Sequence, residues 1–500
     1  MTRNGCCGAA GRRLARYGAG ILVILSCAAC AVGPDYVRPA ATPVMPAVYK
    51  ELDGWKTAQP GAVSLRENWW ELFGDPQLNR LEERVAAANQ NVAAAEAQYR
   101  QARALAQASR AGYFPTLSVG PAISRAQRSA NVGSGTFGGG SVNSDFTLPA
   151  SLSWEIDLWG RIRRGVEASR AGAAASAADL AAVRLSMQAE LASDYFQLRT
   201  LDAQRQLLDE TVGNYAKTLE LTRNRYASGV AASSDVLQAE TQLKSTRAQA
   251  LDLGVQRAQL EHAVAVLVGT PAAQFTLASV PLNGMPPVVP AGIPSQLLER
   301  RPDIAAAERR MAAANAQIGV TEAAWYPTLR LSASGGFESS DIASWFSWPS
   351  RFWSVGPAVS ETIFDGGLRR AQDDQARAAF DATVAAYRQT VLTGFQEVED
   401  NLAALRILAT EAQVQDEAVQ AARRAVTVTT NQYKAGTVDY LNVLVTQTAE
   451  LTNRRTAVDI LGRRMAASVA LVKALGGGWQ AAEATETPRT GAPGGRGHVE

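Results

Sequence analysis

The strongest constraint on this chain lies in residues 146–229, where one periodicity changes into another. From Phe146 to Leu158 every second residue is apolar, which is the period of a β-strand with one apolar face. From Arg161 to Ser228 there is no proline, and apolar residues recur three and four positions apart, as on one face of a helix. As one helix, these 68 residues would span ~100 Å, whereas globular helices average roughly 11–12 residues. A strand that feeds such a helix suggests a barrel wall that continues into a helical tube.

The same arrangement recurs in the second half of the chain. The segment 431–436 matches 224–229 at an offset of 207, and both halves carry Pro-Thr-Leu at the end of a helix. Each half therefore predicts a helix, two strands, a long helix, a turn and a further helix. The first repeat is 75–270, with strands at about 116–125 and 145–158 and helices at 161–228 and 235–269. The second is 295–476, with strands at about 328–338 and 352–364 and helices at 368–435 and 441–475.

Helix boundaries follow from capping residues. Asp75 is expected to cap a helix that has Pro76 at its first position and runs without interruption to about Ala111. The helix after the first turn is expected to take its cap from Ser233, Ser234 or Asp235.

The remaining segments connect these elements. Residues 30–74 contain several prolines and no sustained period, so they predict an extended segment, and the proline-rich residues 271–294 predict a linker. Residues 131–140 contain five glycines between two strand patterns; since the chain has no Gly-Lys pair, they indicate a hairpin loop rather than a phosphate-binding loop. Residues 477–500 predict a disordered tail.

The first 29 residues read as a secretory signal, because four arginines precede a short apolar core that cannot span a bilayer permanently. A plain positive leader explains Arg12 and Arg13 better than a twin-arginine signal. All four cysteines lie here, and the spacing of Cys27 and Cys30 is not followed by the βαβ pattern of a redox domain. The segment resembles a bacterial lipobox, with Cys30 as the acylated residue, bearing N-palmitoyl and S-diacylglycerol groups, and Cys27 as the rival.

The predicted strands require further copies of the chain if they are to form a barrel. Four strands with an apolar outer face cannot close a barrel, and an open sheet edge cannot exist in lipid. Outer-membrane barrels start at about eight strands, so the chain must form an oligomer if these strands span a membrane; two copies would supply eight strands and three copies twelve. The aromatic residues Trp345, Phe346 and Trp348 predict either an interfacial belt or a buried hairpin core.

The composition argues against enzymes and nucleic-acid binding. The net charge is +2 without a basic cluster, which gives no reason to expect a nucleic-acid partner. His262 and His498 are the two histidines, so neither a His-pair metal site nor a Ser-His-Asp triad is easily assembled within the chain. We therefore expect no catalytic residue, no metal site and no cofactor.

A set of short motifs, in one order, resembles the TolC-like outer-membrane efflux channels, and specifically the NodT-type lipoproteins paired with resistance–nodulation–division (RND) pumps. The motifs are Gly33-Pro34-Asp35-Tyr36, Trp69-Trp70, Arg301-Pro302-Asp303, Tyr326-Pro327 and Gly476-Gly477-Gly478-Trp479. The resemblance covers residues 30–479 and implies an α+β membrane protein of two tandem structural repeats. It implies a homotrimer with a twelve-stranded outer-membrane β-barrel, four strands per chain, continued by a long α-helical periplasmic barrel.

The resemblance also implies a function. The channel would passively conduct drugs, toxic compounds or metal ions across the outer membrane of a Gram-negative bacterium, together with a periplasmic adaptor and an inner-membrane RND pump. Two alternatives stay open: a type I protein-secretion channel, which uses the same duct, and a lipid-anchored envelope rod without a pore.

The expected sites are at the ends of the long helices. The two turns are the expected adaptor-docking tips, with Gly229 and Gly436 in left-handed conformations that reverse the chain; their residues are Tyr226, Gly229, Asp235, Tyr433, Gly436 and Asn442. In the family, charged residues near the end of the second long helix form a closing constriction. Here residues 427–432 are uncharged, so the possible gate residues are Arg423, Arg424 and Thr430.

Overall fold

The structure is a computed structural model that describes residues 31–42, 46–52, 68–127, 129, 131, 142–289 and 297–480. Cys30 and the predicted tail beyond residue 480 lie outside these residues. By their contacts the residues group into two compact units. Unit 1 contains the described residues of 1–43, 93–180 and 306–390, and unit 2 those of 44–92, 181–305 and 391–500.

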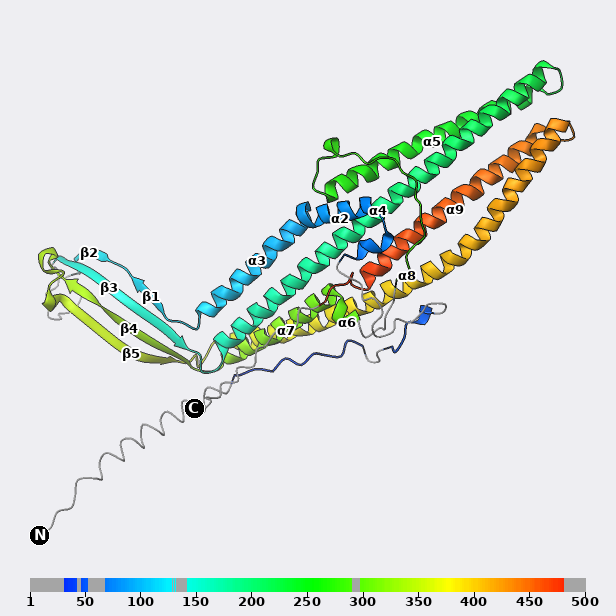
Figure 1. The fold of residues 1–500 in the computed structure, drawn as a ribbon. Helices are drawn as coiled ribbons and strands as arrows, with labels where there is room; N and C mark the ends of the chain where they lie inside the picture. The colour runs from blue at the N-terminus through cyan, green and yellow to red at the C-terminus, as the bar shows by residue number, and fades with distance from the viewer. Residues whose placement is uncertain are drawn as a thin grey trace, which may run out of the picture. The chain divides into compact units, whose positions relative to one another are not determined.

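Unit 1 contains an antiparallel sheet (Figure 1). Its strands are β1 (Thr116–Val119), β2 (Ala122–Gln127), β3 (Val142–Ile156), β4 (Thr328–Ser339) and β5 (Arg351–Ser360). β3 pairs with β1 and β2 on one side and with β4 on the other, and β5 pairs with β4. The two strands of each repeat are therefore neighbours, and β3 and β4 join the repeats.

One predicted strand is interrupted. The alternation over 116–125 predicts a single strand, but the structure has β1 and β2 on either side of Gly120 and Pro121. Proline has no backbone N–H to contribute to a ladder, so the strand breaks where Pro121 occurs. Both parts still pair with β3, and the Gly120 N–H donates to the Pro149 carbonyl at 3.3 Å.

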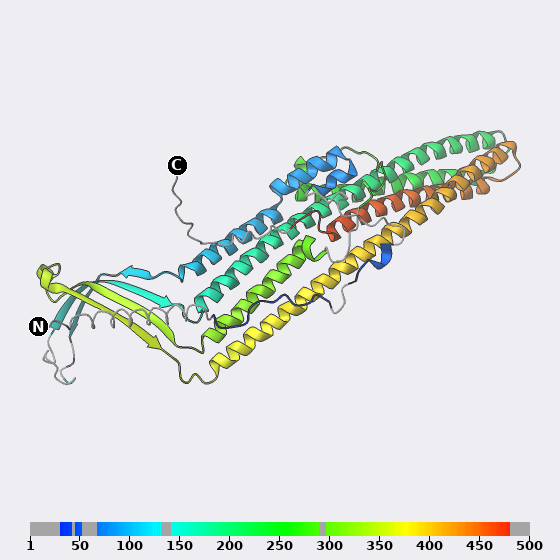
Figure 2. The same ribbon diagram turned by 60° about the horizontal axis from the view of Figure 1, so that its bottom comes forward.

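Most of the described chain is helical (Figure 2). The helices are α2 (Pro76–Ala88), α3 (Gln90–Ala111), α4 (Arg161–Ala227), α5 (Ser233–Leu267), α6 (Leu297–Arg300), α7 (Pro302–Ala323), α8 (Leu368–Ala435) and α9 (Tyr440–Ala474). Short 3-10 turns include Lys50–Leu52, Trp69–Phe73, Ala272–Gln274, Ile342–Ser344 and Trp348–Ser350. Among the described helices, none combines the length and apolar character needed to cross a bilayer.

Two predicted helices are each divided in two. The helix expected over 76–111 breaks at Asn89, whose extended backbone (φ −68°, ψ 126°) ends α2. The Asn89 side chain accepts hydrogen bonds from the N–H groups of Asn91 and Val92, so it caps α3. The helix expected from about 295 breaks at Arg301 because Pro302 follows it, and Pro302 becomes the first residue of α7.

The expected caps have different outcomes. Asp75 caps α2, because its Oδ1 accepts from the N–H groups of Gln77 and Leu78. Its Oδ2 also accepts a 2.5 Å hydrogen bond from the hydroxyl of Tyr195. The prediction of a side-chain cap for α5 is wrong, because Ala232 occupies the N-cap position and no side-chain cap is formed.

Unit 2 holds the main apolar core. Trp69 and Trp70 are buried there with residues of α2, α4 and α9, among them Leu78, Leu191, Leu198 and Val472. Arg301 is 7% exposed, and its guanidinium donates to Asp303, to Glu397 at 2.6 Å and to the Ala474 carbonyl at 3.1 Å. The Arg-Pro-Asp motif therefore closes this core against the end of α9.

Glu82 on α2 is fully buried in unit 2, and neither carboxylate oxygen has a hydrogen-bond partner. Burial raises its pKa to about 9, well above the ordinary glutamate value of roughly 4.3. Between about pH 4.3 and pH 9, Glu82 is therefore neutral in the folded state and ionised in the unfolded state. Its contribution to stability is fully present below about pH 4.3 and is lost as the pH rises toward 9.

We expect Glu82→Gln to match the wild type in thermal stability at pH 4 and to exceed it increasingly from pH 6 to pH 8, because the variant has no group to ionise. Thermal melts of the helical circular-dichroism signal in detergent measure this. The matched control is Glu83→Gln, the exposed neighbour on the same helix, which should show no such trend. Parallel pH curves for Glu82→Gln and the wild type would contradict the prediction.

Candidate functional site

The sheet of unit 1 has one apolar and one hydroxyl-bearing face. Residues that pair directly across an antiparallel sheet point to the same face. One such row across four strands is Leu117, Leu152, Ala333 and Val355. The adjacent row, on the opposite face, is Ser118, Ser151, Ser334 and Ser354. The alternation of apolar and polar residues along each strand is thus aligned with that of its neighbours across the sheet.

The hydroxyl face contains small side chains that bond to one another and to the backbone. The Ser334 and Ser354 hydroxyl oxygens lie 2.9 Å apart, and the Ser332 hydroxyl donates to the Gly356 carbonyl at 3.3 Å. The apolar face is open to the surroundings: Leu117, Val355 and Val359 are 66–70% exposed. Among the described strands, the outer edges of β1, β2 and β5 have no pairing partner. Within the described residues, the sheet therefore has two different faces and two unpaired edges.

Aromatic side chains gather between β4 and β5. Trp345 stacks on Phe346 with ring centroids 4.8 Å apart and also contacts Phe146 at 5.7 Å. Phe346 and Trp348 are 63% and 75% exposed. The alternative of a buried hairpin core therefore does not hold for these two residues, and the interfacial belt stays a prediction.

The turns at the ends of α4 and α8 have the same backbone geometry. Gly229 and Gly436 adopt φ values of +74° and +76°, the left-handed conformation expected from the sequence. The Gly229 N–H donates to the Tyr226 carbonyl at 2.9 Å, and the Gly436 N–H donates to the Tyr433 carbonyl at 3.0 Å. In each turn the N–H of the residue after the glycine donates to the carbonyl of the residue before the tyrosine. This second hydrogen bond completes a Schellman motif.

The equivalent tyrosines of the two turns differ in burial. Tyr226 is 52% exposed, whereas Tyr433 is 3% exposed in a small core with Leu219, Ala239, Tyr440 and Val443. Arg225 lies over the Tyr433 ring at 4.8 Å and donates to the Lys434 carbonyl at 3.0 Å. The ends of α4 and α8 are thus joined within one chain. Of the other predicted tip residues, Asn442 is exposed and Asp235 is half-buried.

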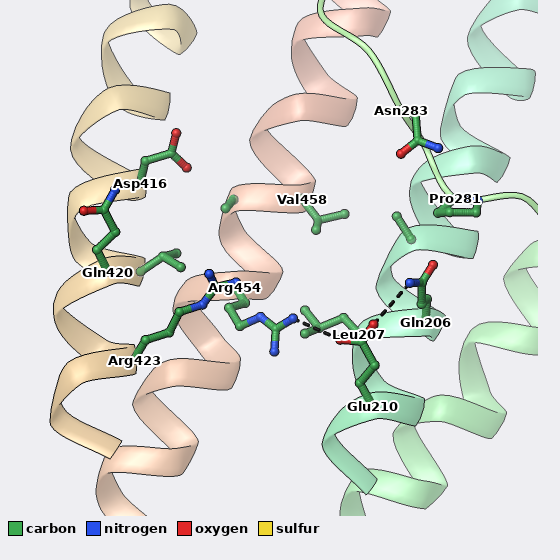
Figure 3. Close-up of a pocket in the computed structure, with 13 residues that line it drawn as sticks. Gln206, Leu207, Glu210, Pro281, Asn283, Asp416, Gln420, Arg423, Arg454 and Val458 are labelled. Atoms are coloured by element: carbon green, nitrogen blue, oxygen red, sulfur yellow. Dashed lines mark hydrogen bonds and ion pairs between the residues drawn. The ribbon is translucent and has the colours of Figure 1, made fainter. Parts of the chain in front are cut away.

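A groove of about 420 Å³ lies between α4, α8 and α9 (Figure 3). Arg454 of α9 extends across it to Glu210 of α4, with the ion pair at 3.1 Å. A hydrogen bond from Gln206 and the pairing with Arg454 together lower the pKa of Glu210. Arg423 lines the same groove from α8.

The structure thus separates the possible gate residues. Arg423 lies with Arg454 and Glu210 around one groove, whereas Arg424 and Thr430 are not among the residues that line it. Sequence reasoning missed Arg454, because it occurs within a regular helix and carries no motif. A correct alignment of α9 against α4 would have been needed to find it.

No group of three or more metal-binding side chains occurs among the described residues, and His262 is an exposed residue of α5. The structure presents a two-faced sheet, two turns of matching geometry and a charged groove.

Comparison with known proteins gives the chain a family. The protein-family model described as outer membrane efflux protein matches residues 81–270 and 293–477 of this chain. The pyoverdine export outer membrane protein OpmQ of Pseudomonas aeruginosa is 33% identical over 419 residues, which are 82% of this chain and 87% of that protein. Outer membrane protein OprJ of the same species is 32% identical over 471 residues, or 92% and 95% of the two chains.

The fold agrees with this assignment. The solved outer-membrane channel OprN superposes with a TM-score of 0.84 at 31% identity, over 90% of this chain and all of that one. Both the helical part and the sheet are therefore those of a known channel architecture, a mostly helical α+β fold. This chain belongs to the outer membrane efflux protein family.

Proposed function

We propose that three copies of this chain form an outer-membrane channel that passively conducts small molecules delivered by an RND-type pump. The observation that carries the proposal is the sheet with one apolar face, one hydroxyl face and two free edges. Lipid cannot hydrogen-bond a free edge, so the sheet must close on other copies before it can cross a bilayer. Because β1 and β2 together occupy one strand position beside β3, each copy supplies four positions, and three copies make a twelve-stranded barrel with the hydroxyl face lining its lumen.

The partners follow from the family and from the turns. We infer that the two turns, with Tyr226, Gly229, Asp235, Tyr433, Gly436 and Asn442, dock a periplasmic adaptor. The left-handed glycines and the hydrogen bonds around them give the two turns the same backbone geometry, which suits a repeated docking surface. Relatives are named for pyoverdine export and for efflux of antibiotics, solvents and toluene, which supports drugs and other toxic compounds as cargo here, while metal ions remain a further candidate. Arg423 is retained as a gate residue, with Arg424 and Thr430 as further candidates.

The direct test is assembly and conductance of the purified full-length protein. Chemical cross-linking in mild detergent should stop at three subunits, and the same sample should open pores in a planar bilayer. A stable monomer with intact β-structure would contradict the edge-closure argument. A trimer without conductance, even after proteolytic removal of the turns, would favour the non-conducting envelope rod.

We also propose that Cys30 is acylated and anchors the amino terminus in the outer membrane. Cys30→Ser should give a protein that lacks the lipid mass increment in intact-mass spectrometry, whereas Cys27→Ser, made as the matched control, should retain it. The sheet should still insert in Cys30→Ser, because the apolar face supplies more membrane affinity than the acyl chains do. Loss of the increment in Cys27→Ser alone would assign the acylation to Cys27.

A further inference from the structure

The helices of the two repeats correspond residue by residue. α5 and α9 each have 35 residues and begin 207 positions apart, at Ser233 and Tyr440. α4 and α8 begin the same number of positions apart, at Arg161 and Leu368. Each residue of α4 or α5 therefore has an equivalent 207 positions later in α8 or α9.

Within unit 2, α4 of the first repeat packs against α9 of the second repeat. Arg454 of α9 forms the 3.1 Å ion pair with Glu210 of α4 (Figure 3). Further along the same two helices, a Cβ built on Gly462 would lie 3.1 Å from the Cβ of Thr200, so the two backbones approach closely there. These contacts fix the register in which one repeat packs against the other.

The equivalents of the ion-paired residues lie apart from each other on the surface of unit 2. Glu417 of α8 is the equivalent of Glu210, and Arg247 of α5 is the equivalent of Arg454, so the acid and the base are both retained. Glu417 and Arg247 are exposed, and among the residues that the structure describes neither side chain has an ion-pair or hydrogen-bond partner. The two surfaces thus carry complementary charges at the positions where the in-chain contact has its ion pair.

Apolar side chains lie along the same two surfaces. Leu221 and Leu444 pack against one small core within the chain, and their equivalents Val428 and Leu237 are exposed. An exposed apolar stripe with this spacing on a long helix is typical of a helix that packs against another. The stripe residues are 54–70% exposed and lie on α5 (Leu237, Leu251 and Val255) and on α8 (Ile407, Val414 and Val428).

We propose that α8 of one copy packs against α5 of the next copy in the register of the in-chain contact between α4 and α9. Glu417 then pairs with Arg247 of the next copy, and Ile407 contacts Val255 of the next copy. The two surfaces are different, so the contact is head-to-tail and the copies can close into a ring. The inference rests on the trimer of the proposed function and adds the surfaces and the register by which its copies meet.

The contact between copies is more apolar than the contact within the chain. The in-chain pair Thr200 and Gly462 is small, whereas the equivalent pair Ile407 and Val255 is large. Removal of these larger side chains from water favours association, and the charged pair favours one register over its alternatives.

A disulfide between copies tests the register. The Cβ positions of the equivalent in-chain pair are 3.1 Å apart, and a disulfide joins Cβ atoms that are roughly 3.5–4.5 Å apart. Oxidation of the full-length variant Ile407→Cys with Val255→Cys in detergent should therefore give covalent trimers, which reduction returns to single chains. Each copy would be linked to both of its neighbours.

Two matched variants control for register and for chain identity. Val266 is 70% exposed and lies on the same side of α5 as Val255, but about 16 Å further along the helix. Ile407→Cys with Val266→Cys should therefore form no covalent oligomer. Thr200→Cys with Gly462→Cys, the equivalent pair within the chain, should form its disulfide without linking copies.

Reversal of the charges tests the ion pair separately. Glu417→Arg would place two arginines opposite each other at every contact between copies, so it should lower the temperature at which the trimer dissociates in detergent. Addition of Arg247→Glu to this variant should restore the wild-type dissociation temperature, because the pair is then present in reverse. A double variant that is no more stable than Glu417→Arg would contradict the proposed register.

The outcomes separate this inference from the trimer itself. A wild type that forms trimers, combined with no disulfide between Ile407→Cys and Val255→Cys, would overturn the proposed contact and leave the trimer standing. Equal cross-linking through Val266→Cys would also overturn it, because the register would then be unspecified. A wild type that stays monomeric in detergent would contradict both the trimer and this inference.

Discussion

Leu152→Arg should almost abolish the outer-membrane form of this protein. Leu152 pairs with Leu117 and Ala333 in the apolar row of the sheet, so an arginine there would face lipid. A lipid-facing arginine costs about 2–4 kcal/mol near the bilayer midplane, and a trimer would carry three of them. The measurement is the yield of heat-modifiable trimer in the outer-membrane fraction.

The neighbouring residue is the matched control. Ser151 pairs with Ser118 and Ser334 in the hydroxyl row, on the opposite face of the same strand. Ser151→Arg adds the same charge and bulk within one residue of Leu152, but on the face that would line the lumen of the proposed barrel, so we expect near-normal trimer yield. Equal insertion defects in the two variants would reject the assignment of the faces.

The double variant Gly229→Val with Gly436→Val should lose export while it retains its assembly. Both glycines have positive φ, where a residue with a Cβ costs roughly 1–2 kcal/mol. This cost comes from the backbone conformation and not from steric clashes. A Cβ on Gly229 would meet nothing within 4 Å, and a Cβ on Gly436 would lie at an ordinary 3.7 Å from the Arg225 guanidinium. That cost is small beside the packing of the long helices, so the trimer should form at the normal level.

Docking is more demanding than folding here, because all six turns of a trimer would have to match one adaptor ring. We therefore expect cells with the double variant to become as sensitive to pump substrates as cells without the channel. The matched control is Gly213→Ala with Gly254→Ala, two helical glycines whose added Cβ atoms also meet nothing within 4 Å, and it should keep resistance. Wild-type resistance in the double variant would show that the turns take no part in docking, and loss of trimer would show a role in assembly.

Local periodicity was enough to predict most elements of this fold. The alternation of β3 and β4 and the proline-free helical spacing of α4 and α8 are long and uninterrupted, so neither leaves much doubt about element type. The glycines of the two turns were also identifiable, because each follows a tyrosine by three residues at the end of a long helix and a left-handed residue is needed to reverse the chain.

Element boundaries and breaks were less predictable. Asn89 divides the first helix by capping α3 with its own side chain, but nothing in the surrounding alanine-rich sequence distinguishes it from a helical asparagine. Its Nδ2 also donates to the Leu267 carbonyl at 2.9 Å, a contact between residues far apart in the chain. Pro121 was visible in the sequence, yet only pairing with β3 shows that the strand resumes after it.

The sequence by itself determined the element types, the repeat and the two faces of every strand, because these depend on residues close together in the chain. Only the tertiary structure decided which residues far apart in the chain meet: Arg164 with the Gly33 carbonyl, Arg454 with Glu210, and Tyr433 with Arg225. Each of these contacts joins elements whose relative register is set by the packing of whole helices. A helical period states which face a residue occupies, but not which turn of another helix lies opposite it.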